Sequence, residues 1–165
     1  MKKPTLLVSA CLLGQPVRYD GRAKPVDSPH WQALRERFEL LPACPECLGG
    51  LPTPRAPAEI AGGDGGSVLR GEAMVKTEAG EDVSAAFAAG AQIMRQTAQR
   101  HGCEHALLKA NSPSCGNRRI YDGSFTSTLR EGDGVAASLL RQHGIQVWNE
   151  EEIASLLQAM ETPPR

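Results

Sequence analysis

The sequence has no excess of charge of either sign. Its 18 lysine and arginine residues nearly balance 19 aspartate and glutamate residues, which gives a formal net charge of −1 over 165 residues. Binding to a polyanion through bulk electrostatics is therefore not favoured, and nucleic acid is not an expected partner. A local basic cluster remains compatible with one small polar or anionic ligand.

The sequence also lacks a long apolar run. The apolar segment Thr5–Ala10 follows the basic start Met1–Pro4 and is far too short for a membrane span or for the apolar part of a signal peptide. We therefore expect a cytoplasmic protein with no membrane partner. The length suits one domain, residues 1–165, that buries a hydrophobic core without covalent staples.

The sequence also lacks the even number of cysteines that a framework of intramolecular disulfides requires. The chain has 5 cysteines. Reducing compartments keep thiols free, and cysteines in such a setting more often bind metals or take part in catalysis. The cysteine count therefore favours a ligand-binding or catalytic role.

Short apolar strands alternate with amphipathic helices along most of the chain. Strands are predicted at Thr5–Ala10, Glu39–Ala43, Ala106–Lys109 and Ile145–Trp148. Helices are predicted at His30–Phe38, Val83–Ala98, Gly134–His143 and Glu150–Met160. Ser28 and Pro29 are expected to cap and open the first helix, and Asn149 to cap the last. This alternation predicts an α/β fold: a single compact three-layer domain with a short, mostly parallel, Rossmann-like sheet.

Glycine and proline interrupt this pattern between residues 49 and 71. We expect an irregular loop there, and the segment Gly62–Gly66 is interpreted either as a binding loop or as a disordered stretch. A small hairpin-like excursion is expected at Val68–Thr77, and a short extended piece at Ile120–Phe125.

Three of the predicted strands lead directly into a cysteine. Cys11 and Cys44 follow the first two strands, and Cys115 follows the third in a tight loop that Pro113 prevents from continuing as a strand. Parallel strands bring their carboxyl ends to one edge of a sheet, so these thiols are expected to converge. Three convergent thiols predict an iron–sulfur or zinc site.

The remaining cysteines leave alternatives open. Cys44 and Cys47 form a C-x-x-C pair, which is typical of a redox dithiol or of half a zinc site. A rival to the iron–sulfur interpretation is thus a closed structural zinc site of Cys11, Cys44, Cys47 and Cys115, and another is a thiol redox protein. Cys103, near the end of a predicted helix, is interpreted as a core residue.

Several blocks of the sequence carry a further signal: Val8–Gly14, Val17–Gly21, Cys44–Glu46, Gly49–Arg55, Ser112–Gly116 and Ile120–Gly123. Together they resemble the signature motifs of the DUF523 family, whose characterised branch comprises thiouracil desulfurases. The resemblance implies a compact α/β domain that binds a [4Fe-4S] cluster through Cys11, Cys44 and Cys115. It also implies two catalytic residues, Glu46 and Ser112. Cys47 departs from the family pattern, and we interpret it as a bystander rather than a fourth ligand.

The residue types make the implied chemistry intelligible. Three thiolates leave one iron of a four-iron cluster without a protein ligand, and a soft thiocarbonyl sulfur suits that open iron. Glu46 would transfer protons while water replaces sulfur, and Ser112 would orient the substrate or relay a proton, with no net redox change. The alternatives are a solvated carboxylate for Glu46 and a turn-forming hydroxyl for Ser112. The implied substrate is a small thiolated base such as 2-thiouracil, or a related thioamide.

Two basic residues, Arg55 and Lys109, lie in the same loops. Each is expected either to steady a polar heterocycle or a leaving sulfide, or to form an ordinary ion pair.

Overall fold

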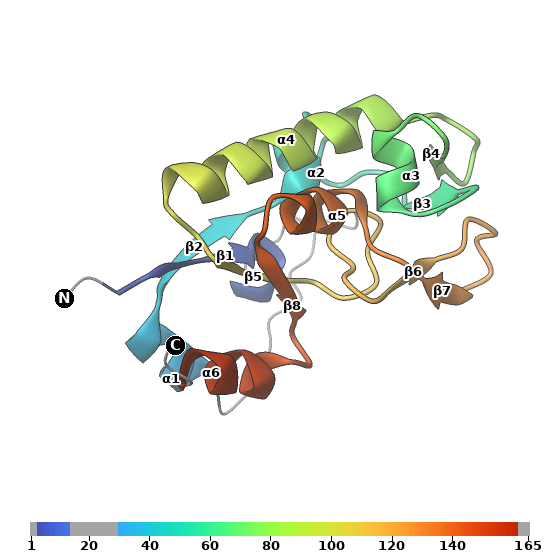
Figure 1. Cartoon of the computed structure of the whole chain (residues 1–165). Helices are drawn as coiled ribbons and strands as arrows, with labels where there is room; N and C mark the ends of the chain where they lie inside the picture. Colours follow the sequence, from blue (N-terminus) through green and yellow to red (C-terminus); the bar gives the residue numbers. More distant parts are fainter. Residues whose placement is uncertain (1–2, 14–29, 162–165) are drawn as a thin grey trace.

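A four-stranded parallel sheet lies at the centre of the computed structural model, which describes residues 3–13 and 30–161 (Figure 1). The strands are ordered β2-β1-β5-β8 and every neighbouring pair is parallel. Their bounds are Thr5–Ser9 for β1, Glu39–Ala43 for β2, His105–Leu108 for β5 and Gln146–Asn149 for β8. All four predicted strands are present, within one residue of the predicted bounds.

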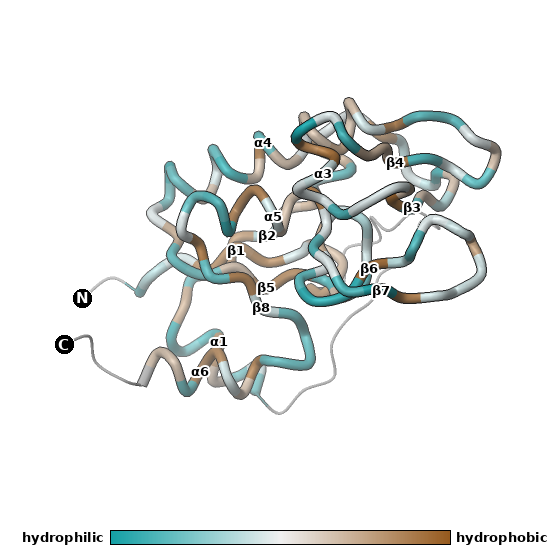
Figure 2. The backbone as a smooth tube through the Cα atoms, turned by 45° about the vertical axis from the view of Figure 1, so that its right-hand side comes forward, coloured by the Kyte–Doolittle hydropathy of each residue, from teal (hydrophilic) through white to brown (hydrophobic). Residues whose placement is uncertain are grey.

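Helices cover both faces of this sheet. α1 (Trp31–Arg37) and α6 (Ile153–Glu161) lie on one face, and α4 (Ser84–Arg100) and α5 (Val135–Gln142) on the other (Figure 1). Leu6 and Val8 pack in the cluster that contains α1 and α6, whereas Leu7 packs in the cluster of α4 and α5, because successive side chains of a strand point to opposite faces. Hydrophobic colour accordingly follows the strands between the helical layers in Figure 2. The predicted three-layer α/β fold is confirmed.

At two places a turn lies where a strand or a helix was predicted. β1 ends at Ser9, and Ala10–Leu13 forms a 3-10 turn, η1, that carries Cys11. The last helix begins at Ile153, not at Glu150, because the chain first makes a turn in which the Asn149 carbonyl accepts the Glu152 amide at 2.9 Å. Asn149 is thus the last residue of β8 and does not cap the helix. The predicted cap was wrong. Ser28, Pro29 and the motif Val17–Gly21 lie outside the described residues.

The segment predicted as an irregular loop over residues 49–71 contains regular structure, and that prediction was wrong in part. β3 (Ala58–Ala61) pairs antiparallel with β4 (Met74–Thr77). Between them lies α3 (Gly65–Leu69), where Oδ1 of the N-cap residue Asp64 accepts the Ser67 amide at 3.0 Å. The Gly62–Gly66 segment therefore leads into a capped helix.

A second small sheet consists of β6 (Arg119–Tyr121) and β7 (Leu129–Glu131), paired antiparallel. The extended piece predicted at Ile120–Phe125 holds for its first two residues only. β6 and β3 contact one another, and a hydrophobic cluster with Ile60, Val75 and Ile120 joins both small sheets to α4 and α5. Figure 1 shows the two small sheets beyond the carboxyl ends of β1 and β5. They are thus placed to close off the edge of the sheet where the cysteines emerge.

No helix within residues 3–13 and 30–161 combines the length and the apolar character needed to cross a membrane.

A short helix that was not predicted, α2 (Pro45–Leu48), follows Cys44 and lies against α4 with almost no space between the backbones. A Cβ added at Gly90 of α4 would overlap the carbonyl oxygen of Pro45, and one added at Gly49 would overlap the carbonyl oxygen of Ala86. These two glycines therefore permit an approach that no larger residue allows. The approach fixes α2, and with it the residues at the start of α2.

We predict that Gly90→Ala destabilises the protein. In a free helix this change stabilises by about 1 kcal/mol, but here the clash with Pro45 forces α2 and α4 apart, so we expect a net loss of about 2 kcal/mol in the free energy of unfolding. Urea denaturation measures it. Ala89→Ser, which adds one heavy atom at the exposed neighbouring position, is the matched control and should change the free energy by less than about 0.5 kcal/mol. A stabilised Gly90→Ala variant would contradict the close contact.

Candidate functional site

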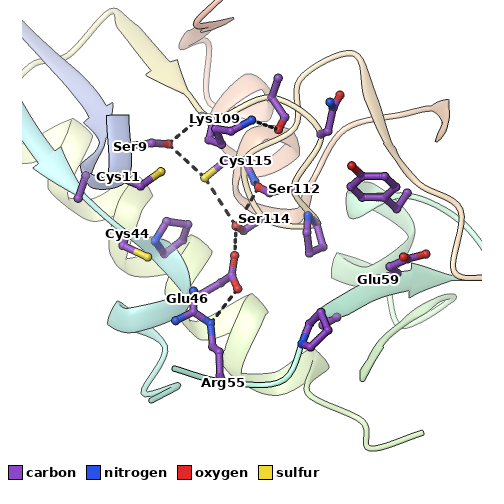
Figure 3. A pocket seen from close by; sticks show the side chains of 18 of the residues that line it. Ser9, Cys11, Cys44, Glu46, Arg55, Glu59, Lys109, Ser112, Ser114 and Cys115 are labelled. Atoms are coloured by element: carbon purple, nitrogen blue, oxygen red, sulfur yellow. Dashed lines mark hydrogen bonds and ion pairs between the residues drawn. The ribbon is translucent and has the colours of Figure 1, made fainter. Parts of the chain in front are cut away.

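A cavity of about 340 Å³ lies at the carboxyl ends of the central strands. It is lined by Cys11 from η1 after β1, Cys44 after β2 and Cys115 after β5 (Figure 3). The structure thus brings together the three cysteines that the sequence places at strand ends 33 and 71 residues apart in the chain (44 − 11 and 115 − 44). Cys11 and Cys115 are buried, with 7% and 4% of their surface exposed, and Cys44 is partly buried.

The loop that carries Cys115 is held by the first turn of α5. The amides of Gly134, Val135 and Ala136 donate to the carbonyls of Gly116, Pro113 and Ser114 at 2.6, 2.8 and 2.8 Å. A helix leaves its first amides without intrahelical partners, so the loop and the helix satisfy one another. Gly134 permits this contact, because a Cβ there would overlap the Ser114 carbonyl.

Two hydroxyl groups contact the Cys115 sulfur. Ser9 Oγ donates to Cys115 Sγ at 3.4 Å and itself accepts the Lys109 amide at 2.9 Å. Ser114 Oγ lies 3.6 Å from the same sulfur. Hydrogen bonds of this kind stabilise negative charge on a sulfur and orient it, as outer contacts do around metal ligands.

Glu46 is fixed at both carboxylate oxygens. Oε2 accepts from Ser114 Oγ at 2.8 Å, and Oε1 pairs with Arg55 Nε at 3.1 Å. Only 6% of the Arg55 side chain and 16% of the Glu46 side chain are exposed. Figure 3 shows Glu46 between Arg55 and the sulfur atoms, so its carboxylate is a directed group of the cavity wall and not a solvated surface charge.

Ser112 lines the same cavity. Its Oγ accepts the Cys115 amide at 2.8 Å and lies 3.4 Å from Ser114 Oγ. The Ser112 oxygen therefore has the turn-forming role that the alternative interpretation expected. The hydroxyl proton is not used by that turn and remains to donate elsewhere.

Burial disfavours the charged form of two of the thiols. It raises the pKa of Cys115 to about 11, despite hydrogen bonds from Ser9 and Ser114 that lower it, and it raises the pKa of Cys44 to about 12. Without a cation in the cavity both thiols are therefore protonated at neutral pH. Metal binding needs the thiolates, so a bound metal group would release these protons and supply the compensating charge.

Cys47 and Cys103 lie elsewhere. Cys103 is buried in the core among α4, α5 and the sheet, as predicted. Cys47 is not among the described residues that line the cavity; its Sγ is 3.4 Å from Thr53 Oγ1 and 3.9 Å from an Arg55 nitrogen. A closed zinc site would bring four sulfurs to about 2.3 Å from one ion. Within the described part of the chain, no three histidine, cysteine or acidic side chains are grouped closely enough to hold a single ion.

The far wall of the cavity comes from the small sheets. Glu59 of β3, 9% exposed, lies across from the cysteines, and its Oε1 accepts the amides of Gly123 and Phe125 at 2.9 and 3.2 Å (Figure 3). Tyr121 and Phe125 line the same wall. Aromatic side chains thus contribute to the lining of the cavity.

Sequence reasoning missed several residues of the site. Ser9 and Ser114 were not singled out, although each stands within two residues of a site cysteine. Glu59 and Glu150 were missed too. Glu150 pairs with Lys109 Nζ at 2.9 Å and accepts the Ala110 amide at 2.7 Å, which ties the end of β5 to the segment after β8. Lys109 and Arg55 are thus both in ion pairs, as one of the two interpretations expected.

Comparison with known proteins gives consistent matches over nearly the whole chain. Residues 6–152 match the family model described as 2-thiouracil desulfurase. The chain is 42% identical over 152 residues to the uncharacterized protein YbbK of Bacillus subtilis strain 168. The aligned residues cover 92% of this chain and 99% of YbbK. Among solved structures it is similar to the [4Fe-4S]-dependent thiouracil desulfidase TudS (DUF523Vcz), with a TM-score of 0.85 and 46% identity over 96% of this chain and 98% of that one.

We predict that Arg55→Met costs much more stability than a matched exposed variant. Removing Arg55 leaves the Glu46 carboxylate largely buried without its cation, and we expect a loss of about 3 kcal/mol in the free energy of unfolding. Arg70→Met breaks the exposed pair with Glu72, whose side chains are 58% and 61% exposed, and should cost at most about 1 kcal/mol. Urea denaturation compares the two. Equal losses would show that the Arg55–Glu46 pair is no stronger than a surface contact.

Proposed function

Because this chain belongs to the 2-thiouracil desulfurase family, we propose that it removes sulfur from a small thiocarbonyl compound such as 2-thiouracil and depends on a [4Fe-4S] cluster. The observation that carries this proposal is the convergence of Cys11, Cys44 and Cys115 on one cavity that also holds Glu46. None of the five cysteines, all of which lie in the described part of the chain, is in a disulfide, and the proposal includes a reducing, cytoplasmic setting.

The donor set fits such a cluster. Thiolates are the ligands that iron–sulfur clusters take, and the three proposed ligands come from three separate strand ends around a space of about 340 Å³. Cys47 lies outside this lining, so we assign three ligands and not four. When bound, a cluster with three protein thiolates supplies an iron open to a soft thiocarbonyl sulfur, which it polarises as a Lewis acid.

Glu46 is the proposed proton carrier. Ser114 and Arg55 hold its carboxylate toward the cavity, so Oε2 can take a proton from water as that water adds to the thiocarbonyl carbon. The same oxygen then returns a proton to the departing sulfur. In the net reaction, oxygen from water replaces sulfur on the carbon and hydrogen sulfide leaves, so no oxidant or reductant is required.

Ser112 is the proposed orienting residue. The Cys115 amide fixes its oxygen, and the hydroxyl proton is then directed either at a polar atom of the substrate ring or at Ser114 Oγ. Through Ser114 the hydroxyl pair connects to Glu46. We therefore assign Ser112 to positioning the ring or relaying a proton to Glu46.

The cluster is tested first by purification of the full chain without oxygen. We expect a brown protein with about four iron and about four acid-labile sulfide per chain. Cys115→Ser should lose most of the iron, whereas Cys103→Ser, the matched change in the core, should keep it. Zinc in place of iron, or equal iron in both variants, would contradict the proposed ligand set.

The role of Glu46 is tested by Glu46→Gln. This nearly isosteric change removes the proton acceptor, and we expect sulfide release from 2-thiouracil to fall by about 100-fold or more while the iron content stays the same. Glu72→Gln removes an exposed carboxylate that is also ion-paired, and it should leave the rate unchanged. Full activity of Glu46→Gln would remove Glu46 from the mechanism.

A further inference from the structure

Cys44 and Cys47 belong to the same turn at the start of α2. Cys44 is the N-cap residue, with an extended backbone at φ −130° and ψ 110°, and Cys47 is the third helical residue. Residues three apart in a helix lie on the same side of it, about one turn from each other. Burial, above all, and also a side-chain hydrogen bond with Cys47 raise the pKa of Cys44 to about 12.

The two thiols differ in their surroundings. Cys44 lines the cavity, whereas Cys47 lies outside it and contacts Thr53 and Arg55. Cys47 is partly exposed, while Cys11 and Cys115 are buried. A dissolved reagent therefore reaches Cys47 before it reaches the two buried cavity thiols.

We propose that Cys44 and Cys47 are a reversible modification site, in which the cluster-free chain forms an intramolecular disulfide by exchange with a small-molecule disulfide such as oxidised glutathione. Cys47 attacks one sulfur of the glutathione disulfide, loses its proton and releases one glutathione thiol. Cys44 then attacks the Cys47 sulfur, loses its proton and displaces the second glutathione thiol. Two protein thiols are oxidised to one disulfide, and one glutathione disulfide is reduced to two thiols.

Formation of this bond removes the Cys44 thiol from those that can bind a metal in the cavity. Both residues belong to one helical turn, in which the Leu48 amide donates to the Cys44 carbonyl at 2.9 Å, so the bond joins neighbouring side chains without moving separate segments. Only two of the three cavity thiols then remain. The effect of this loss on cofactor uptake rests on the proposed function. Formation of the disulfide does not rest on it.

Disulfide mapping tests the chemistry without iron. The full chain, prepared free of metal, is equilibrated with graded ratios of oxidised to reduced glutathione, alkylated, digested and analysed by mass spectrometry. We expect a peptide with Cys44 and Cys47 joined to each other, while Cys11 and Cys115 remain alkylatable after unfolding. A chain that carries only glutathione adducts, or a disulfide that involves Cys11 or Cys115, would overturn the proposal.

Iron uptake tests the consequence. After the oxidising treatment, anaerobic iron and sulfide uptake by the unmodified chain should fall about tenfold and return with dithiothreitol. Cys47→Ser should take up iron equally with or without the treatment, and Cys103→Ser, the matched core change, should behave like the unmodified chain. Cys47→Ser that cannot take up iron at all would make Cys47 a ligand and overturn the proposal. A chain that takes up no iron under any condition would contradict the proposed function alone, because the mapping still decides on the disulfide.

Discussion

The hydrogen bonds between the Cys115 loop and the first turn of α5 are the constraint on which the rest of the site depends. The carbonyls of Pro113, Ser114 and Gly116 accept amides at the start of α5, so the loop cannot shift without leaving helix donors unpaired in a buried place. With the loop fixed, Cys115 is held toward the cavity and Ser114 toward Glu46. α5 in turn packs on α4, so the sulfur is positioned by the same layer that covers the sheet.

Ser114 joins two parts of the molecule that are 68 residues apart in the chain. Its hydroxyl contacts both the Glu46 carboxylate and the Cys115 sulfur, so the proposed proton carrier and a proposed metal ligand share one hydrogen-bonding group. Glu46 reaches this position because α2 lies directly on α4 through Gly49 and Gly90. The local charge balance is completed by Arg55, whose side chain is almost fully buried. The site thus forms where the parallel sheet meets α2, a short helix whose position is fixed by its contact with α4.

Much of the fold could be predicted from the sequence, and the reason is periodicity. β1, β2 and β5 contain runs of apolar residues, β8 alternates exposed and covered side chains, and α4 and α5 show helical spacing of buried residues. The convergence of the cysteines followed from the parallel sheet, and the family resemblance was confirmed. α2 and α3 were missed because helices of 4 and 5 residues have no periodic signal and depend on tertiary contacts. Ser9 and Ser114 were missed because a hydroxyl carries no sign in the sequence of a partner so distant along the chain.

The chain between Arg55 and α4, which contains β3, α3 and β4, makes a long detour that contributes nothing to the hydrogen bonds of the central sheet. It nevertheless supplies Pro57, Ala58 and Glu59 to the lining of the cavity, and Glu59 lies across from the cysteines (Figure 3). This part of the cavity wall is therefore encoded in a different stretch of sequence from Cys44, Glu46 and Arg55. Substitutions within residues 57–59 would therefore reshape the wall of the cavity that faces an incoming molecule while every residue proposed to hold the cluster or to move a proton stays in place.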